Sequence, residues 1–173
     1  MAVVRGQLTL EEFLRRPERK PALEFEDGEV TQKASPGGQH SLLQTKVSEL
    51  VNRALEPGKI ALAFVELRTT FAGRSYVPDV SVFRWDRIPL TDDGIVSDEF
   101  FSPPDLAIEI VSPKQSLSKL IRRCLWFVDH GVPLALLLDP DDESIRLFSP
   151  GQSPTLLQGS DAIDLGDLLP ALR

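Results

Sequence analysis

The sequence predicts an α/β domain in which a mixed β-sheet is flanked by helices. Five of the six residues in 106–111 are apolar, which is typical of a strand that is covered on both faces. The spacing of apolar residues over 117–128 predicts an amphipathic helix, and residues 134–138 predict a second buried strand. A strand, a helix and a strand in this order form a βαβ unit, so we expect parallel strands with a right-handed crossover.

Composition indicates one folded domain that spans residues 1–173. The 42% content of hydrophobic residues argues against disorder, and the single cysteine, Cys124, excludes an internal disulfide and a zinc site built on cysteines. Cys124 lies on the apolar stripe of the predicted helix, so we expect it in the core. No stretch has the roughly 20 apolar residues of a membrane span, and we expect a cytoplasmic protein without a membrane partner.

The net charge of −7 is only weak evidence against nucleic-acid binding, because the acids are unevenly distributed. Seven acids and two bases lie in residues 139–173, which leaves 19 acids and 17 bases in residues 1–138. The nearly neutral part can therefore still present a basic surface to a polyanion.

The first half of the chain predicts an additional helix and hairpin before the core. Thr9 to Glu12 reads as a capping box that starts a short helix, and Asp27-Gly28 predicts a β-hairpin. A second helix is expected from about residue 40 to 55. Residues 60–71 predict one long strand that forms an antiparallel hairpin with a strand over 76–83, and residues 84–103 predict an irregular excursion.

Two acids interrupt the predicted core strands. Asp79 lies in the strand over 76–83, and Glu109 lies in the middle of the apolar run 106–111. A buried carboxylate is costly unless it is paired, protonated or bound to a cation. On adjacent strands the two carboxylates can converge, and oxygen ligands suit Mg²⁺ or Mn²⁺. The alternative is that each acid lies at a solvated strand edge.

The order of these features resembles the core of the PD-(D/E)XK nuclease superfamily. Pro78-Asp79 matches the "PD" of that pattern, and Glu109 matches its second acid. A closer resemblance, to the Uma-two family of putative restriction endonucleases, covers most of the chain. The segments that carry it are Leu8–Phe13, Glu24–Glu29, Ser35-Pro36, His40, Pro78-Asp79-Val80, Pro104-Asp105-Leu106, Glu109–Pro113, Gly131-Val132 and Asp139-Pro140.

The resemblance implies a restriction-endonuclease-like core and Mg²⁺-dependent cleavage of DNA. It makes Asp79 and Glu109 the ligands of the metal ion, with Mn²⁺ as a substitute for Mg²⁺. It also makes Glu29 and His40 outer members of the site. From its position in the first turn of a helix alone, a solvated histidine is the favoured interpretation of His40, with a place in the site as the alternative.

The superfamily's lysine is absent from its usual position, two residues after Glu109, where this chain has Val111. Lys119 and Arg123 follow on one flank of the helix over 117–128. We expect one of them to supply the missing charge and favour Lys119, because an amine can also hydrogen-bond a nucleophilic water. The alternative is that both are ordinary solvated bases.

The sequence therefore predicts a Mg²⁺-dependent deoxyribonuclease with DNA as its substrate. Two alternatives stay open: a nuclease fold that has lost catalysis and binds DNA or protein, and an unrelated α/β interaction domain. Trp126 lies opposite the apolar stripe of its helix, which suggests a second burial partner. On that basis we expect a homodimer.

Overall fold

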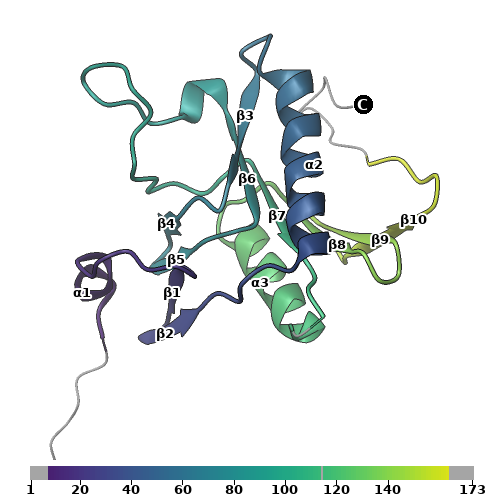
Figure 1. The fold of residues 1–173 in the computed structure, drawn as a ribbon, viewed down its shortest axis with the longest axis horizontal. Helices are drawn as coiled ribbons and strands as arrows, with labels where there is room; N and C mark the ends of the chain where they lie inside the picture. The colour runs from purple at the N-terminus through teal and green to yellow at the C-terminus, as the bar shows by residue number, and fades with distance from the viewer. Residues whose placement is uncertain (1–7, 114, 164–173) are drawn as a thin grey trace, which may run out of the picture.

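Two β-sheets organise the chain in the computed structural model, which describes residues 8–113 and 115–163 (Figure 1). The larger sheet has the strand order β10-β9-β8-β7-β6-β3, and the smaller has the order β2-β1-β5-β4. The larger sheet contains β3 (Ala61–Val65), β6 (Val80–Arg84), β7 (Leu106–Ile110), β8 (Leu134–Asp139), β9 (Ser144–Phe148) and β10 (Thr155–Gln158). The smaller sheet contains β1 (Leu23–Glu26), β2 (Glu29–Gln32), β4 (Thr69–Phe71) and β5 (Arg74–Tyr76).

The predicted βαβ unit is confirmed. Strand β7 pairs in parallel with β8, with Glu109 opposite Leu137, and helix α3 (Leu117–Asp129) connects them. The other pairs of the larger sheet are antiparallel, so the sheet is mixed as predicted. Gly131 follows α3 with a φ of 102°, a left-handed conformation that ends the helix at little cost for glycine.

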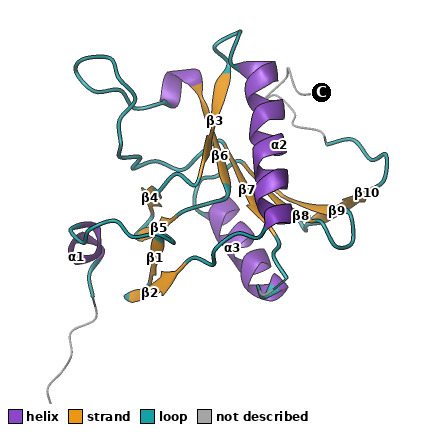
Figure 2. Cartoon of the chain, in the orientation of Figure 1, coloured by secondary structure: helices purple, strands orange, loops and turns teal. Residues whose placement is uncertain are grey.

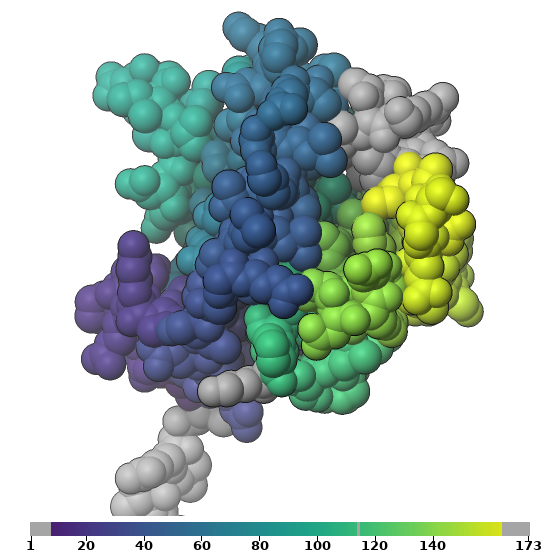
Figure 3. Space-filling view, turned by 45° about the vertical axis from the view of Figure 1, so that its right-hand side comes forward, coloured from purple at the N-terminus to yellow at the C-terminus, as the bar shows by residue number. Residues whose placement is uncertain are grey.

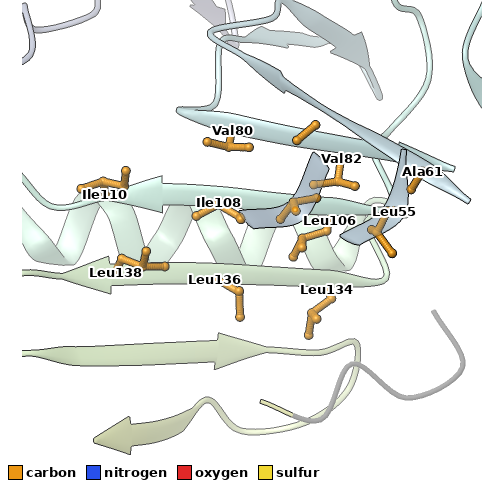
Figure 4. Close-up of a cluster of buried hydrophobic side chains, with 12 residues drawn as sticks. Leu55, Ala61, Val80, Val82, Leu106, Ile108, Ile110, Leu134, Leu136 and Leu138 are labelled. Carbon is orange, nitrogen blue, oxygen red and sulfur yellow. The ribbon is translucent and has the colours of Figure 1, made fainter. Parts of the chain in front are cut away.

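Helices cover both faces of the larger sheet (Figure 2). Helix α2 (Gly38–Leu55) packs on one face and α3 on the other. Because side chains alternate along a strand, each face has its own core. The core on the α2 face is drawn in Figure 4; its strand residues include Val80, Val82, Leu106, Ile108, Ile110, Leu134, Leu136 and Leu138. The core on the α3 face includes Ala107, Leu120, Cys124, Phe127, Ala135 and Leu137.

The N-terminal elements follow their local signals. Helix α1 (Leu10–Leu14) begins with the predicted capping box, in which Thr9 and Glu12 cap each other's backbone amides. The turn at Asp27-Gly28 joins β1 and β2 in the predicted antiparallel hairpin.

The prediction of one long strand over 60–71 was wrong. Glu66 adopts a φ of 50°, which breaks the strand after Val65 and sends the chain from the larger sheet to the smaller one. The strand predicted over 76–83 divides in the same way. Residues 77–79 lead from β5 back to β6, so this short segment links the two sheets.

The excursion over 84–103 is mostly irregular, as predicted, with one turn of 3₁₀ helix at Trp85–Arg87. Part of it projects from the body of the molecule, in teal at the upper left of Figure 3. Phe100 is buried against Phe64 and Phe83, whereas Phe101 is 60% exposed. Phe100 therefore anchors the segment, and its neighbour does not.

Trp126 finds its second burial partner within the same chain. Its ring packs against Phe71 and Tyr76, stacks on His130 at 4.4 Å between ring centroids, and carries the Arg74 guanidinium at 4.8 Å. The reason for expecting a dimer through this side chain is thereby removed, and the homodimer stays a prediction. No helix in the described ranges combines the length and apolar character that crossing a membrane requires.

We expect Leu137→Ala to destabilise the fold strongly, because Leu137 is fully buried in the central strand β8. Loss of a buried leucine typically lowers the free energy of unfolding by about 2–5 kcal/mol. Urea denaturation measures the change. Leu156→Ala, at a residue that is 51% exposed, is the control and should cost less than about 1 kcal/mol. Equal losses in the two variants would contradict the assignment of the core.

Candidate active site

Asp79 lies directly before β6 and faces Glu109 on the neighbouring strand β7. Strands β6 and β7 are antiparallel with Val80 opposite Ile108, and the next pair in this register is Asp79 and Glu109. The Ile110 amide donates a hydrogen bond of 2.7 Å to Asp79 Oδ2. Directly opposed residues have Cβ atoms about 4.5–5.5 Å apart. The structure thus brings the two predicted acids together, and it buries both to 1% exposure.

The backbone holds Asp79 firmly at the junction of the two sheets. Its carbonyl accepts hydrogen bonds from the Gln44 side chain at 2.8 Å and from the Glu66 amide at 3.2 Å. By strand alternation, Glu109 shares the face of Ala107 and Leu137, which is the face that packs on α3. The two carboxylates are therefore enclosed between the larger sheet, α3 and the hairpin sheet.

Arg123, on α3, joins Glu109 to a third buried acid. Its Nη1 lies 3.2 Å from Glu109 Oε1, and its two Nη atoms donate to both oxygens of Glu24 at 3.1 and 2.5 Å. Glu24 also accepts a hydrogen bond from the Val77 amide at 2.9 Å. Arg123 is thus the base of α3 that contacts the buried acids, and its catalytic role stays a prediction.

Lys33 supplies a second buried cation on the side of Asp79. Its Nζ lies 2.7 Å from Asp79 Oδ1 and donates a hydrogen bond of 2.8 Å to the Val77 carbonyl. Burial acts to lower the pKa of Lys33, but the carboxylates of Asp79 and Glu109 outweigh it, so its pKa is raised. The ammonium is therefore charged at neutral pH.

His40 also reaches Asp79, which favours its role at the site over that of a solvated histidine. Its side chain is buried, with Nε2 3.1 Å from Asp79 Oδ1 and Nδ1 2.8 Å from Ser112 Oγ. Burial acts to raise the pKa of Asp79, yet His40 and Lys33 together lower it below its usual value. Asp79 is thus a carboxylate at neutral pH.

The pKa of Glu109 shifts in the opposite direction to that of Asp79. It is enclosed completely, and desolvation raises its pKa to about 7 although Arg123 acts to lower it; the negative charges of Asp79 and Glu24 add to the rise. With Glu109 protonated, two carboxylates face two cations, and the cluster of Glu24, Lys33, Asp79, Glu109 and Arg123 is neutral. The charges of the cluster are therefore balanced only while Glu109 holds its proton.

Two predicted site residues lie elsewhere. Glu29 is exposed at the tip of the hairpin, opposite Glu26, because the two-residue turn places it there and not beside Asp79. Lys119 is exposed one turn before Arg123 on α3 and forms no ion pair with a described acid. Neither residue contacts the buried acids, and the roles of Glu29 as an outer member of the site and of Lys119 in catalysis stay predictions.

Two residues of the cluster were not predicted. Glu24 and Lys33 both come from the hairpin region, and they reach acids or bases that are far away in the sequence. A weak signal was available for Glu24, which lies in a strand whose neighbour Phe25 is apolar. Lys33 directly follows β2, and no sequence pattern around it indicates a buried site residue.

Two cavities border the cluster at Arg123, and several basic side chains line them. A cavity of about 220 Å³ lies between the hairpin and the start of α3, and a second of about 400 Å³ lies on the other side of Arg123. Lys119 lines both cavities, and Arg74 and Arg122 line the second. Side chains with this charge suit a phosphate backbone.

The donor set fits a divalent ion in part. Asp79 Oδ1 is buried, and no described group makes a directed hydrogen bond to it, although Lys33 and His40 are close. Such an oxygen can accept a cation. The described residues contain no ready cluster of three metal-binding side chains. Two carboxylates suffice for Mg²⁺ only if water and substrate complete the shell, which is how Mg²⁺ is commonly bound.

The raised pKa of Glu109 predicts a pH-dependent stability for the metal-free protein. Between about pH 4.5 and 7 the folded state retains a proton that the unfolded chain has lost, so stability falls as pH rises through this window. In EDTA, the wild type should lose on the order of 2–3 kcal/mol relative to Glu109→Gln between pH 4.5 and 8.

Urea denaturation at several pH values tests this expectation. Glu29→Gln removes an exposed carboxyl and is the matched control, for which we expect the wild-type profile. Parallel profiles for the wild type and Glu109→Gln would show that Glu109 does not titrate in this range.

Comparisons with known proteins agree with this architecture. The profile of the Uma2 family, described as "Putative restriction endonuclease", matches residues 10–173. A solved structure of a putative nuclease belonging to DUF820, from Anabaena variabilis, is 38% identical and superposes with a TM-score of 0.91, over 95% of this chain and 93% of that one. No curated protein matches the sequence. The chain belongs to the Uma2 family, the Uma-two family that its motifs resemble, and has the fold of a nuclease.

Proposed function

We propose that the protein is a Mg²⁺-dependent deoxyribonuclease that hydrolyses DNA phosphodiester bonds. The observation that carries the proposal is the pair of buried acids, with Asp79 directly before β6 and Glu109 facing it on β7. Membership of a restriction-endonuclease family supports the reaction class. Oxygen ligands favour Mg²⁺ or Mn²⁺ over softer metals.

Asp79 and Glu109 would hold the ion. When bound, a divalent ion stabilises negative charge on a phosphate and lowers the pKa of water. Arg123 fixes Glu109 through the ion pair at 3.2 Å. Its guanidinium is also shared with Glu24, so Lys119, which is exposed and lines the cavity beside Arg123, is the better candidate to bind a phosphate oxygen.

A second candidate function is a nuclease fold without catalysis that binds DNA or a protein. One feature favours it: Lys33 and Arg123 already neutralise the acids, and Val111 stands where the superfamily has its lysine. DNA binding without cleavage, in the presence of Mg²⁺ or Mn²⁺, would support this candidate over the first.

Asp79→Asn should abolish both metal binding and cleavage. Cleavage of plasmid DNA with saturating Mg²⁺ should fall by about 10²-fold or more, and calorimetric titration should show that Mn²⁺ binding is lost. The matched control is Asp105→Asn, at a buried acid that precedes β7 and pairs with Arg87. Equal Mn²⁺ binding by the wild type and Asp79→Asn would refute the metal site.

Lys119→Ala should lower the rate of cleavage by about 10²-fold if its ammonium meets the phosphate. Because Lys119 makes no ion pair with a described acid, the folded protein should keep its stability. Lys46→Ala removes an exposed lysine of α2 and is the control. An unchanged rate in Lys119→Ala would show that the missing lysine has not moved to this position.

A further inference from the structure

The ammonium of Lys33 is buried among oxygen atoms, as a bound metal ion would be. Its side chain is 7% exposed, and three oxygens surround its Nζ: Asp79 Oδ1 at 2.7 Å, the Val77 carbonyl at 2.8 Å and Glu66 Oε1 at 3.8 Å. Carboxylate and carbonyl oxygens are also the ligands of hard divalent cations. The ammonium and a divalent ion would therefore use the same carboxylate.

We propose that Lys33 is a resident cation that a divalent ion must displace from Asp79, so that Lys33 sets the metal affinity of the site. The inference rests on the proposed function in one respect, namely that Asp79 is a metal ligand. A divalent ion and an ammonium on the same carboxylate repel each other strongly in a buried site, because little water is present to screen them. Metal binding therefore includes the work of moving Lys33.

The structure offers the displaced ammonium a place to go. Lys33 lines the cavity of about 220 Å³ between the hairpin and α3, together with Thr31, Gln32 and Gln115, whose polar groups can solvate it. Lysine has a flexible four-carbon stem, so its ammonium can move into this space while the backbone of residue 33 stays paired with Ala22. Lys119 and Arg123 also line the cavity and would repel the displaced ammonium, whereas Glu24, which lines it too, would attract it.

Calorimetric titration of chelator-treated protein with Mn²⁺ tests the inference. Lys33→Met keeps the length of the side chain without its charge and should bind Mn²⁺ about tenfold more tightly than the wild type, or better. Lys33→Arg keeps the charge and should show no gain. Lys46→Met is the matched control, because it removes an exposed lysine of α2 outside the cluster, and it should leave the Mn²⁺ affinity unchanged. Adding Asp79→Asn to Lys33→Met should abolish the gain.

An affinity in Lys33→Met that equals or falls below that of the wild type would overturn the inference, as would no detectable binding in that variant. Lys33→Gln, which can still donate a hydrogen bond, replaces Lys33→Met if the latter does not fold. A crystal structure of the wild type with Mn²⁺ gives a second test: Lys33 Nζ should lie more than about 4 Å from the Asp79 carboxylate. An ion bound with the Lys33–Asp79 pair intact would refute displacement.

The two proposals can fail separately. Metal-dependent DNA cleavage by the wild type without a gain in Lys33→Met would leave the nuclease function and remove the role of Lys33. A gain that depends on Asp79, with no cleavage by any variant, would support the resident cation and remove the nuclease function.

Discussion

The balance of charge inside the protein is the constraint on which the rest of the structure depends. The acids Glu24, Asp79 and Glu109 are buried beside the cations of Lys33 and Arg123, and the charges balance when Glu109 is protonated. Removing one partner of a buried pair leaves an uncompensated charge, which costs far more than an exposed pair contributes. The position of the hairpin, the rotation of α3 and the path between the sheets all have to preserve these contacts.

Much of the fold could be predicted because its signals are local. The apolar run of β7, the amphipathic pattern of α3, the capping box at Thr9 and the turn at Asp27-Gly28 each fix one element without reference to the others. The break at Glu66 could not be predicted in this way. The residues before and after it favour strands equally, and only their pairing with different sheets divides them.

The same distinction applies to the candidate site. Asp79 and Glu109 stand out because an acid in an apolar strand conflicts with its surroundings, and Arg123 lies on a helix whose direction follows from the βαβ unit. Lys33 does not interrupt an apolar strand in this way, and the corresponding signal at Glu24 is weak. Their contacts, to Val77 and Arg123, cross 44 and 99 positions of sequence and arise only when the hairpin packs on the core.

The buried ion pairs between the two sheets affect how the molecule unfolds locally. The smaller sheet and its flank provide Glu24 and Lys33, whereas the larger sheet and α3 provide their partners. Detaching the hairpin alone would leave the Asp79 carboxylate without Lys33 and the Arg123 guanidinium without Glu24, so opening the hairpin also disrupts contacts of the larger sheet and α3. The smaller sheet has four short strands with few buried apolar groups. We nevertheless expect the amide protons of β1 and β2 to exchange in the same cooperative unit as those of β7.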